Sequence, residues 1–86
     1  MDIHKLKTWP VYYQAVVSGQ KRFEARKDDR DFKEGDVLIL QEYDPKNQEY
    51  TGRQHTVKVD YILVGTAFGI EDGYCVMSIS DHRLAS

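Results

Sequence analysis

The sequence is poor in cysteine and has no long hydrophobic run. Cys75 is the only cysteine among the 86 residues, which excludes an internal disulfide. No stretch approaches the roughly 18 apolar residues that a membrane-spanning helix needs, and the charged segment 1–7 does not resemble a secretory signal. Between Tyr74 and Val76, Cys75 is predicted to be a buried thiol in a reducing compartment. We therefore expect a cytoplasmic protein with no membrane contact.

Repeats, low-complexity segments and linker-like composition are also missing from the sequence. A chain of this length buries only about 60 to 65% of its unfolded surface, which is too little for two separate cores. The apolar share of 41%, the charged share of 30% and ten aromatic residues are typical of a globular protein and exclude disorder. We expect residues 1–86 to form a single domain.

A strong net charge is absent too, because the formal value is only −2. This argues against a general binder of polyanions. The charge is nevertheless uneven: residues 1–30 carry seven bases against four acids, whereas residues 31–86 carry five bases against ten acids. The basic N-terminal third predicts a focused site for an anionic ligand, and the alternative is a mixed, solvated surface.

The first third of the sequence predicts a strand followed by a helix. Residues 3–8 alternate apolar and polar side chains, as a half-buried strand does. Proline then opens a helix over about residues 10–18, with Tyr12, Ala15 and Val16 as its apolar stripe. Gly19 follows as a residue that can take a positive φ at the helix end.

Beyond Gly19 the hydrophobic period changes from 3.6 to 2, which indicates strands. The first of them ends at about Arg26 and has one ionic face, and a charged loop follows over residues 27–35. Residues 36–43 are typical of a strand that is covered on both faces. A long hairpin connection is predicted for residues 44–53. Two further strands are predicted at residues 55–64 and 73–80.

These elements predict an α+β fold that is mainly β. Five strands in so short a chain leave edges that need protection, and a sheet closed on itself with a helix over one opening is the compact solution. We therefore expect a small mixed β-barrel of about five strands with one main helix. A ferredoxin-like sandwich is disfavoured because its second helix would have to form at residues 66–72, which contain Gly69 and are followed directly by Gly73.

The turn from helix to strand has the pattern G-x-K-x-x-E-x-R, formed by Gly19, Lys21, Glu24 and Arg26. Residues i and i+2 of a strand share a face, so Glu24 and Arg26 are expected to point the same way, with Lys21 arriving from the turn. Two cations and a carboxylate in one cleft would suit an anion or a polar heterocycle. The alternative is an exposed ion pair on a solvated strand.

This pattern resembles the signature of ASCH domains, and further segments are similar to the compact DUF3850-type ASCH-like domains of bacteria and phages. The resemblance covers nearly the whole chain and implies a PUA-like fold with a cleft beside the helix. It also implies recognition of RNA or modified nucleobases. The similar segments are residues 4–10, 26–32, 35–36, 42–44, 50–53 and 73–79.

A related ASCH branch contains small amidohydrolases that deacylate N4-acetylcytidine, and the resemblance implies a threonine nucleophile, an activating lysine and a later glutamate there. Lys21 matches the lysine. Glu24 stands at the threonine position, and the later glutamate has no match in this chain. Whether the protein is an enzyme stays open, and Lys21 and Glu24 are the catalytic candidates if it is one.

The remaining candidate residues are assigned by residue type. Trp9 is expected either to stack on a base or to anchor the helix. No cofactor and no metal site is predicted, because His4, His55 and His82 lie far apart in the sequence. Tyr43 and Tyr50 flank the expected hairpin and either face RNA or cover the barrel. The predicted ligand-binding residues are Lys21, Glu24, Arg26, Lys7, Trp9 and Arg30, with residues 28–30 at the rim.

The favoured hypothesis is a module that binds RNA, a nucleoside or a modified nucleobase in a cleft around the motif. A small amidohydrolase acting on N4-acylated cytidine-type nucleosides is the alternative. A protein-interaction domain that uses the acidic C-terminal part is the second alternative. The sequence leaves the oligomeric state open.

Overall fold

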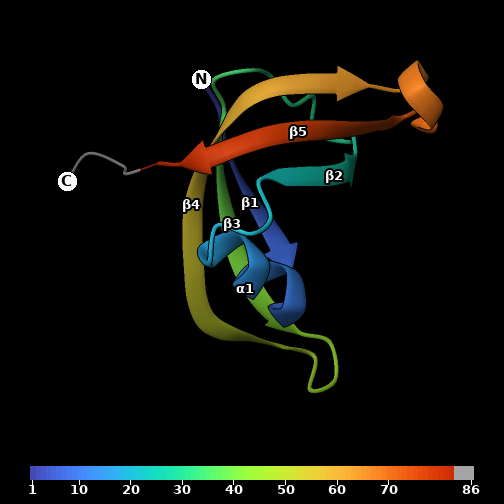
Figure 1. Cartoon of the computed structure of the whole chain (residues 1–86). Coiled ribbons are helices and arrows are strands. Elements are labelled where there is room, and N and C mark those ends of the chain that lie inside the picture. The colour runs from blue at the N-terminus through green and yellow to red at the C-terminus, as the bar shows by residue number, and fades with distance from the viewer. Residues whose placement is uncertain (83–86) are drawn as a thin grey trace.

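The computed structural model describes residues 1–82 and contains one curved sheet, one α-helix and a short 3-10 helix (Figure 1). No helix in this part of the chain is long and apolar enough to cross a membrane. In chain order the elements are β1 (Ile3–Thr8), α1 (Pro10–Val17), β2 (Phe23–Lys27), β3 (Val37–Asp44), β4 (Glu49–Val64), the 3-10 helix η1 (Ala67–Gly69) and β5 (Tyr74–Asp81).

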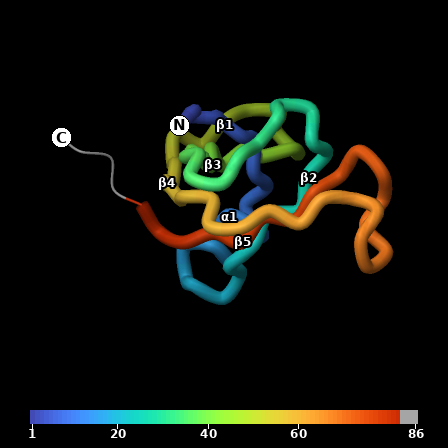
Figure 2. Tube along the Cα trace, turned by 90° about the horizontal axis from the view of Figure 1, so that it is seen from above, coloured from blue at the N-terminus to red at the C-terminus, as the bar shows by residue number. Residues whose placement is uncertain are grey.

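The five strands form one sheet in the order β1-β3-β4-β5-β2. β1 runs parallel to β3, and the other neighbouring strands are antiparallel. The sheet curls into a half-barrel whose edge strands, β1 and β2, turn toward each other without pairing (Figure 2). The predicted mainly β fold of about five strands with one helix is confirmed.

The hydrophobic core lies inside the curl of the sheet. Leu38, Leu40, Val59 and Met77 from the three central strands are completely buried. Each such side chain contributes about 1.5 to 3 kcal/mol through burial. The run of buried residues at the start of β3 confirms the prediction of a strand covered on both faces.

The buried face of α1 differs from the predicted one by one residue. Tyr13 and Val16 are buried, whereas Tyr12 is 51% exposed and stacks on Trp9 with ring centroids 6.5 Å apart. The prediction failed because Val11, Tyr12 and Tyr13 are consecutive apolar residues, so the helical period alone does not decide which of them faces the sheet. Packing of this short helix against β3 decides it.

The predicted long connection over residues 44–53 is wrong. β3 and β4 extend toward each other until only residues 45–48 remain as a turn. Tyr43 and Tyr50 pair across the extended ladder with ring centroids 5.1 Å apart, and aromatic cross-strand pairs stabilise a hairpin. The turn-forming residues had suggested a loop, but the ladder continues on both sides of it.

The buried Asp36 carboxylate connects the start of β3 to β1. It accepts hydrogen bonds from the backbone N–H groups of Asp2 and Lys33, both at 3.0 Å, and from Nε2 of His4 at 2.9 Å. Phe32 packs edge-on against the His4 ring. Burial acts to raise the pKa of Asp36, but the hydrogen bonds from Asp2, His4 and Lys33 outweigh it and hold that pKa below its ordinary value.

Asp36 therefore makes the stability of the fold depend on pH in the acid range. A carboxyl group whose pKa is lower in the folded than in the unfolded chain stabilises the fold at neutral pH, and this contribution is lost as the pH falls below about 4. Asp36→Asn should lower the free energy of unfolding at pH 7 by about 1.5 to 3 kcal/mol. Urea titrations between pH 7 and pH 3 should show the two proteins converging, and a constant difference would contradict this assignment.

Candidate functional site

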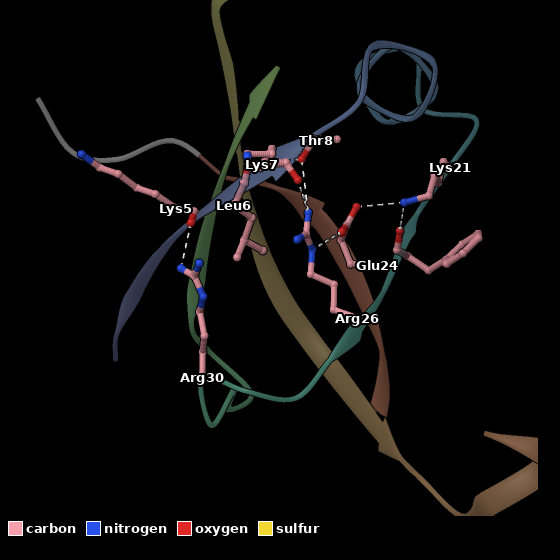
Figure 3. Close-up of polar contacts among 9 residues, drawn as sticks. Lys5, Leu6, Lys7, Thr8, Lys21, Glu24, Arg26 and Arg30 are labelled. Atoms are coloured by element: carbon pink, nitrogen blue, oxygen red, sulfur yellow. Dashed lines mark hydrogen bonds and ion pairs between the residues drawn. The ribbon is translucent and has the colours of Figure 1, made fainter. Parts of the chain in front are cut away.

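The candidate site lies at the seam between β1 and β2, the two edge strands of the half-barrel. Within residues 1–82 no strand pairs with these edges. Arg26 reaches from β2 across the seam and donates Nη2 to the carbonyl oxygen of Lys7 at 2.7 Å. Arg30, in the loop after β2, donates Nη1 to the carbonyl oxygen of Lys5 at 2.8 Å (Figure 3). Two arginine side chains thus bind carbonyl groups that a neighbouring strand would otherwise bind.

Glu24 is held between two cations beside this seam. Its side chain is 5% exposed, and its Oε1 and Oε2 accept hydrogen bonds from Lys21 Nζ and Arg26 Nε, each at 2.9 Å (Figure 3). Lys21 also donates to the carbonyl oxygen of Phe23 at 2.7 Å. Charge-assisted hydrogen bonds of this kind fix the orientation of all three side chains. The structure therefore brings Lys21, Glu24 and Arg26 together, as their spacing predicted.

The ionic face of β2 points into the half-barrel, so the alternative of an exposed ion pair is wrong. Phe23 and Ala25, on the opposite face, are exposed. The helix end sets this register, because Gly19 takes a φ of +82° and the backbone N–H of Lys21 bonds to the carbonyl oxygen of Ala15 at 2.9 Å. The turn thereby directs the charged side chain of Glu24 inward.

These side chains line a cleft of about 650 Å³, a size typical of small-ligand sites. Buried Leu6 and Phe32 contribute apolar surface at its base, and the stacked, half-exposed rings of Trp9 and Tyr12 lie on its outer side. The lining residues are Leu6, Lys7, Thr8, Trp9, Tyr12, Lys21, Phe23, Glu24, Ala25, Arg26, Lys27, Asp29, Arg30, Phe32 and Tyr74.

All of the predicted ligand-binding residues border this cleft, although Lys7 does so in an unexpected way. Its carbonyl oxygen accepts the hydrogen bond from Arg26, whereas its Nζ lies over the ring of Tyr43, 4.1 Å from the centroid. Of the predicted rim, Asp29 and Arg30 line the cleft. Asp28 instead accepts a hydrogen bond from the backbone N–H of Phe32 at 3.2 Å and holds the loop.

Five of the seven bases in residues 1–30 line the cleft, so the charge that is uneven in the sequence is also uneven in the fold. Two acidic residues also line the cleft, and four bases remain when Lys7 is left out because its Nζ lies over Tyr43, so the local charge is positive although the chain is negative overall. Such a field attracts anionic ligands. The bases are Lys7, Lys21, Arg26, Lys27 and Arg30, and the acids are Glu24 and Asp29.

Several lining residues were not among the predicted ligand-binding residues, and Tyr12, Lys27 and Tyr74 are the polar or aromatic examples that matter most for binding. Tyr12 was assigned to the core, and Lys27 was assigned to a loop although it is the last residue of β2. Alternation places Lys27 on the exposed face of β2 with Phe23 and Ala25, so the local pattern did not indicate that it borders the cleft. Tyr74 belongs to the strand paired with β2, and only the pairing register brings it to the cleft.

The described residues that line the cleft offer few groups for covalent catalysis. Thr8 is the only aliphatic hydroxyl among its lining residues in the described part of the chain, and it donates to the carbonyl oxygen of Leu6 at 3.3 Å. Both oxygens of Glu24 are engaged by cations. Cys75 is buried, as predicted, and burial, aided by the charge of Asp28, raises the pKa of its thiol and makes it a poor nucleophile.

Within residues 1–82 one group of side chains is close enough to hold a metal ion. Ligand atoms of Asp2, His4 and Asp36 lie within 4.8 Å of one another. The Asp36 carboxylate already accepts three hydrogen bonds, two of them from backbone N–H groups, which gives the group a structural role. Sequence reasoning found no cysteine or carboxylate at ligand spacing from a histidine, and the cluster was missed because 32 positions separate His4 from Asp36.

Replacing Glu24 by glutamine tests whether this carboxylate organises the seam. Glu24→Gln keeps the size of the side chain but leaves Lys21 and Arg26 without their counter-charge, so the free energy of unfolding should fall by about 3 to 5 kcal/mol. The matched control is Asp31→Asn, which breaks an exposed ion pair with Lys33 and should leave the urea midpoint unchanged. Equal midpoints for both variants in urea titrations would contradict the assigned role.

Comparison with known proteins places this chain in a family. The model of a domain of unknown function, DUF3850, matches residues 3–79. An uncharacterised 12.9 kDa protein from the GpA 3' region of Escherichia phage P2 is 33% identical over 78 residues, which cover 78% of this chain and 70% of that protein. The crystal structure of the hypothetical protein PH0355 is similar in fold, with a TM-score of 0.66 at 18% identity over 95% of this chain and 100% of that one. This chain belongs to the DUF3850 family.

Proposed function

We propose that the protein binds RNA or a nucleotide by taking an unpaired nucleobase into the cleft between β1 and β2. The observation that carries the proposal is the combination of a positively charged cleft with aromatic rings on its outer side. Trp9, whose side chain is half-exposed, offers a stacking surface for a base. Arg30 and Lys27 offer charge for a phosphate. The resemblance to ASCH domains, whose superfamily recognises RNA and modified nucleobases, supports the same ligand class.

Cations that are held in fixed positions favour binding of a specific ligand over non-specific attraction of any anion. Lys21 and Arg26 are oriented by Glu24 and by main-chain carbonyl groups before any ligand arrives, so little conformational entropy is lost when they bind. The negative charge of the rest of the chain opposes tracking along a long phosphate backbone. Affinity should therefore come from one base and one or two phosphates.

Removing the indole of Trp9 tests the proposal. Trp9→Ala should weaken binding of a short single-stranded RNA by roughly 5- to 100-fold, the effect of losing one base stack. Tyr61→Ala is the matched control, because Tyr61 is 61% exposed and does not line the cleft. Isothermal titration calorimetry measures both, and wild-type affinity should fall only roughly 3- to 7-fold between 50 and 200 mM salt. Equal affinities for the two variants would contradict the proposal.

The amidohydrolase alternative has less support. Lys21 stands at the position of the activating lysine, but its Nζ donates to Glu24 and to the carbonyl oxygen of Phe23. A general base needs a free oxygen near the water it activates, and neither oxygen of Glu24 is free of a cation. We therefore favour binding.

The buried thiol of Cys75, the only cysteine in the sequence, suits a reducing compartment, and we propose that the protein is cytoplasmic.

One observation favours the second alternative, a protein-interaction surface at the tip of the β4–β5 hairpin. Phe68 is 92% exposed there and has a φ of 50°, which is rare for a bulky residue. Backbone hydrogen bonds from Ile70 to Ala67 and from Tyr74 to Glu71 hold the tip in shape. A large apolar group presented on a fixed loop suits a protein contact.

Phe68→Ser tests this second candidate without touching the cleft. If the tip contacts a protein, a partner captured by the wild-type chain after nuclease treatment should be lost with Phe68→Ser and retained with Trp9→Ala. Quantitative affinity capture of an identified partner gives the comparison. Retention of the partner by Phe68→Ser would remove this candidate.

A further inference from the structure

The main chain of β2 has an unpaired edge that faces the cleft. In an antiparallel pair, residues alternate between bonding to the partner strand and pointing away from it. The carbonyl oxygen of Arg22 accepts from Ile79 at 3.1 Å, and the N–H of Asp28 donates to Gly73 at 2.8 Å, so the even-numbered residues bond to β5. By this alternation the N–H and C=O groups of Ala25 and Lys27 point toward the seam.

β1 has the same arrangement on the other side of the seam. The N–H of Val37 donates to the carbonyl oxygen of Asp2, so the even-numbered residues of β1 bond to β3 and the odd-numbered residues point away. The carbonyl oxygens of Lys5 and Lys7 are bound by Arg30 and Arg26. Within residues 1–82 no strand and no side chain bonds to the N–H and C=O groups of Ala25. The seam therefore has a free main-chain donor and acceptor in the described part of the chain, at a residue that lines the cleft.

We propose that Ala25 binds the ligand through its main chain, donating its N–H to an acceptor and accepting at its carbonyl oxygen from an adjacent donor. This inference rests on the proposed function and specifies how the base is read. The side chain of Ala25 is exposed and points away from the half-barrel, so the main chain is what this residue presents to the cleft. Trp9 and Tyr12 supply ring surface in the cleft that Ala25 also lines.

The chemistry of this pair defines the ligand class. A donor next to an acceptor occurs on the Watson–Crick edge of every nucleobase, for example at N3–H and O4 of uracil. A main-chain donor and acceptor pair of this kind can bind several bases, but only when the Watson–Crick edge of the base is free. It therefore binds unpaired nucleotides and rejects duplexes. Methylation at N3 of uracil removes the donor of this edge, whereas a methyl group at C5 of uracil leaves the edge intact.

The test compares uridine 5'-monophosphate with its 3-methyl and 5-methyl derivatives by isothermal titration calorimetry on the full chain. The 3-methyl derivative should bind at least 10-fold more weakly than the other two. On the protein side, Ala25→Pro removes the N–H donor and should weaken binding of the unmodified nucleotide by roughly 3- to 10-fold. Proline is tolerated at a strand edge whose N–H faces outward, and Ala25→Ser, which keeps the main chain, should bind as the wild type does.

Each result separates this inference from the function on which it rests. If the wild type binds all three nucleotides equally, or binds duplex RNA as tightly as single-stranded RNA, main-chain reading by Ala25 is wrong and base binding in the cleft stands. If the wild type binds none of the nucleotides and no single-stranded RNA, the proposed function itself is wrong. If Ala25→Pro fails to fold, as judged by its circular dichroism, the methylated nucleotides on the wild type still decide the question.

Discussion

The buried carboxylate of Glu24 is the group on which the rest of the site depends. It accepts from Lys21 at one oxygen and from Arg26 at the other, so one acidic side chain fixes two cations in a partly apolar cleft. Without this carboxylate, Lys21 and Arg26 would place two positive charges in the same confined space. Their mutual repulsion and the loss of solvation would then both oppose their burial. Because Arg26 also binds the Lys7 carbonyl oxygen, the same carboxylate positions the bridge between the two sheet edges.

That bridge explains how a five-stranded sheet can remain an open half-barrel. An unpaired strand edge exposes main-chain donors and acceptors, and proteins usually cover such edges or close the barrel. Here Arg26 and Arg30 cover carbonyl groups of β1 with their side chains, which closes the seam electrostatically and leaves a cleft where another strand would lie. The opening that makes the fold incomplete is thus also the space available to a ligand.

Much of the fold follows from the sequence. The change of period at Gly19 marks the passage from helix to strand, and the apolar run in β3 marks a central strand. Predictions from local patterns failed where contacts between residues distant in the sequence determine the structure. The choice of Tyr13 over Tyr12 for the core depends on the sheet beneath α1, and the extension of the β3–β4 ladder depends on the pairing of Tyr43 with Tyr50.

The site, like the fold, was predictable where local spacing determines it and not where contacts between distant residues do. The i, i+2 spacing of Glu24 and Arg26 places both on one face, but spacing does not say whether that face points inward. The burial of Glu24 depends on the curl of the whole sheet. The hydrogen bonds of Arg26 and Arg30 to β1 join residues 19 and 25 positions apart, and no local pattern contains them.

The most direct test of this account is a two-dimensional 1H–15N spectrum of the labelled protein titrated with uridine 5'-monophosphate. The account predicts that the resonances that move belong to the seam, namely the backbone amides of Ala25, Lys27 and Lys7 and the indole N–H of Trp9. The amides of residues 65–73, at the far tip of the β4–β5 hairpin, should stay in place. Shifts confined to that tip, or no shifts at millimolar nucleotide, would contradict the claim that the seam is the binding site.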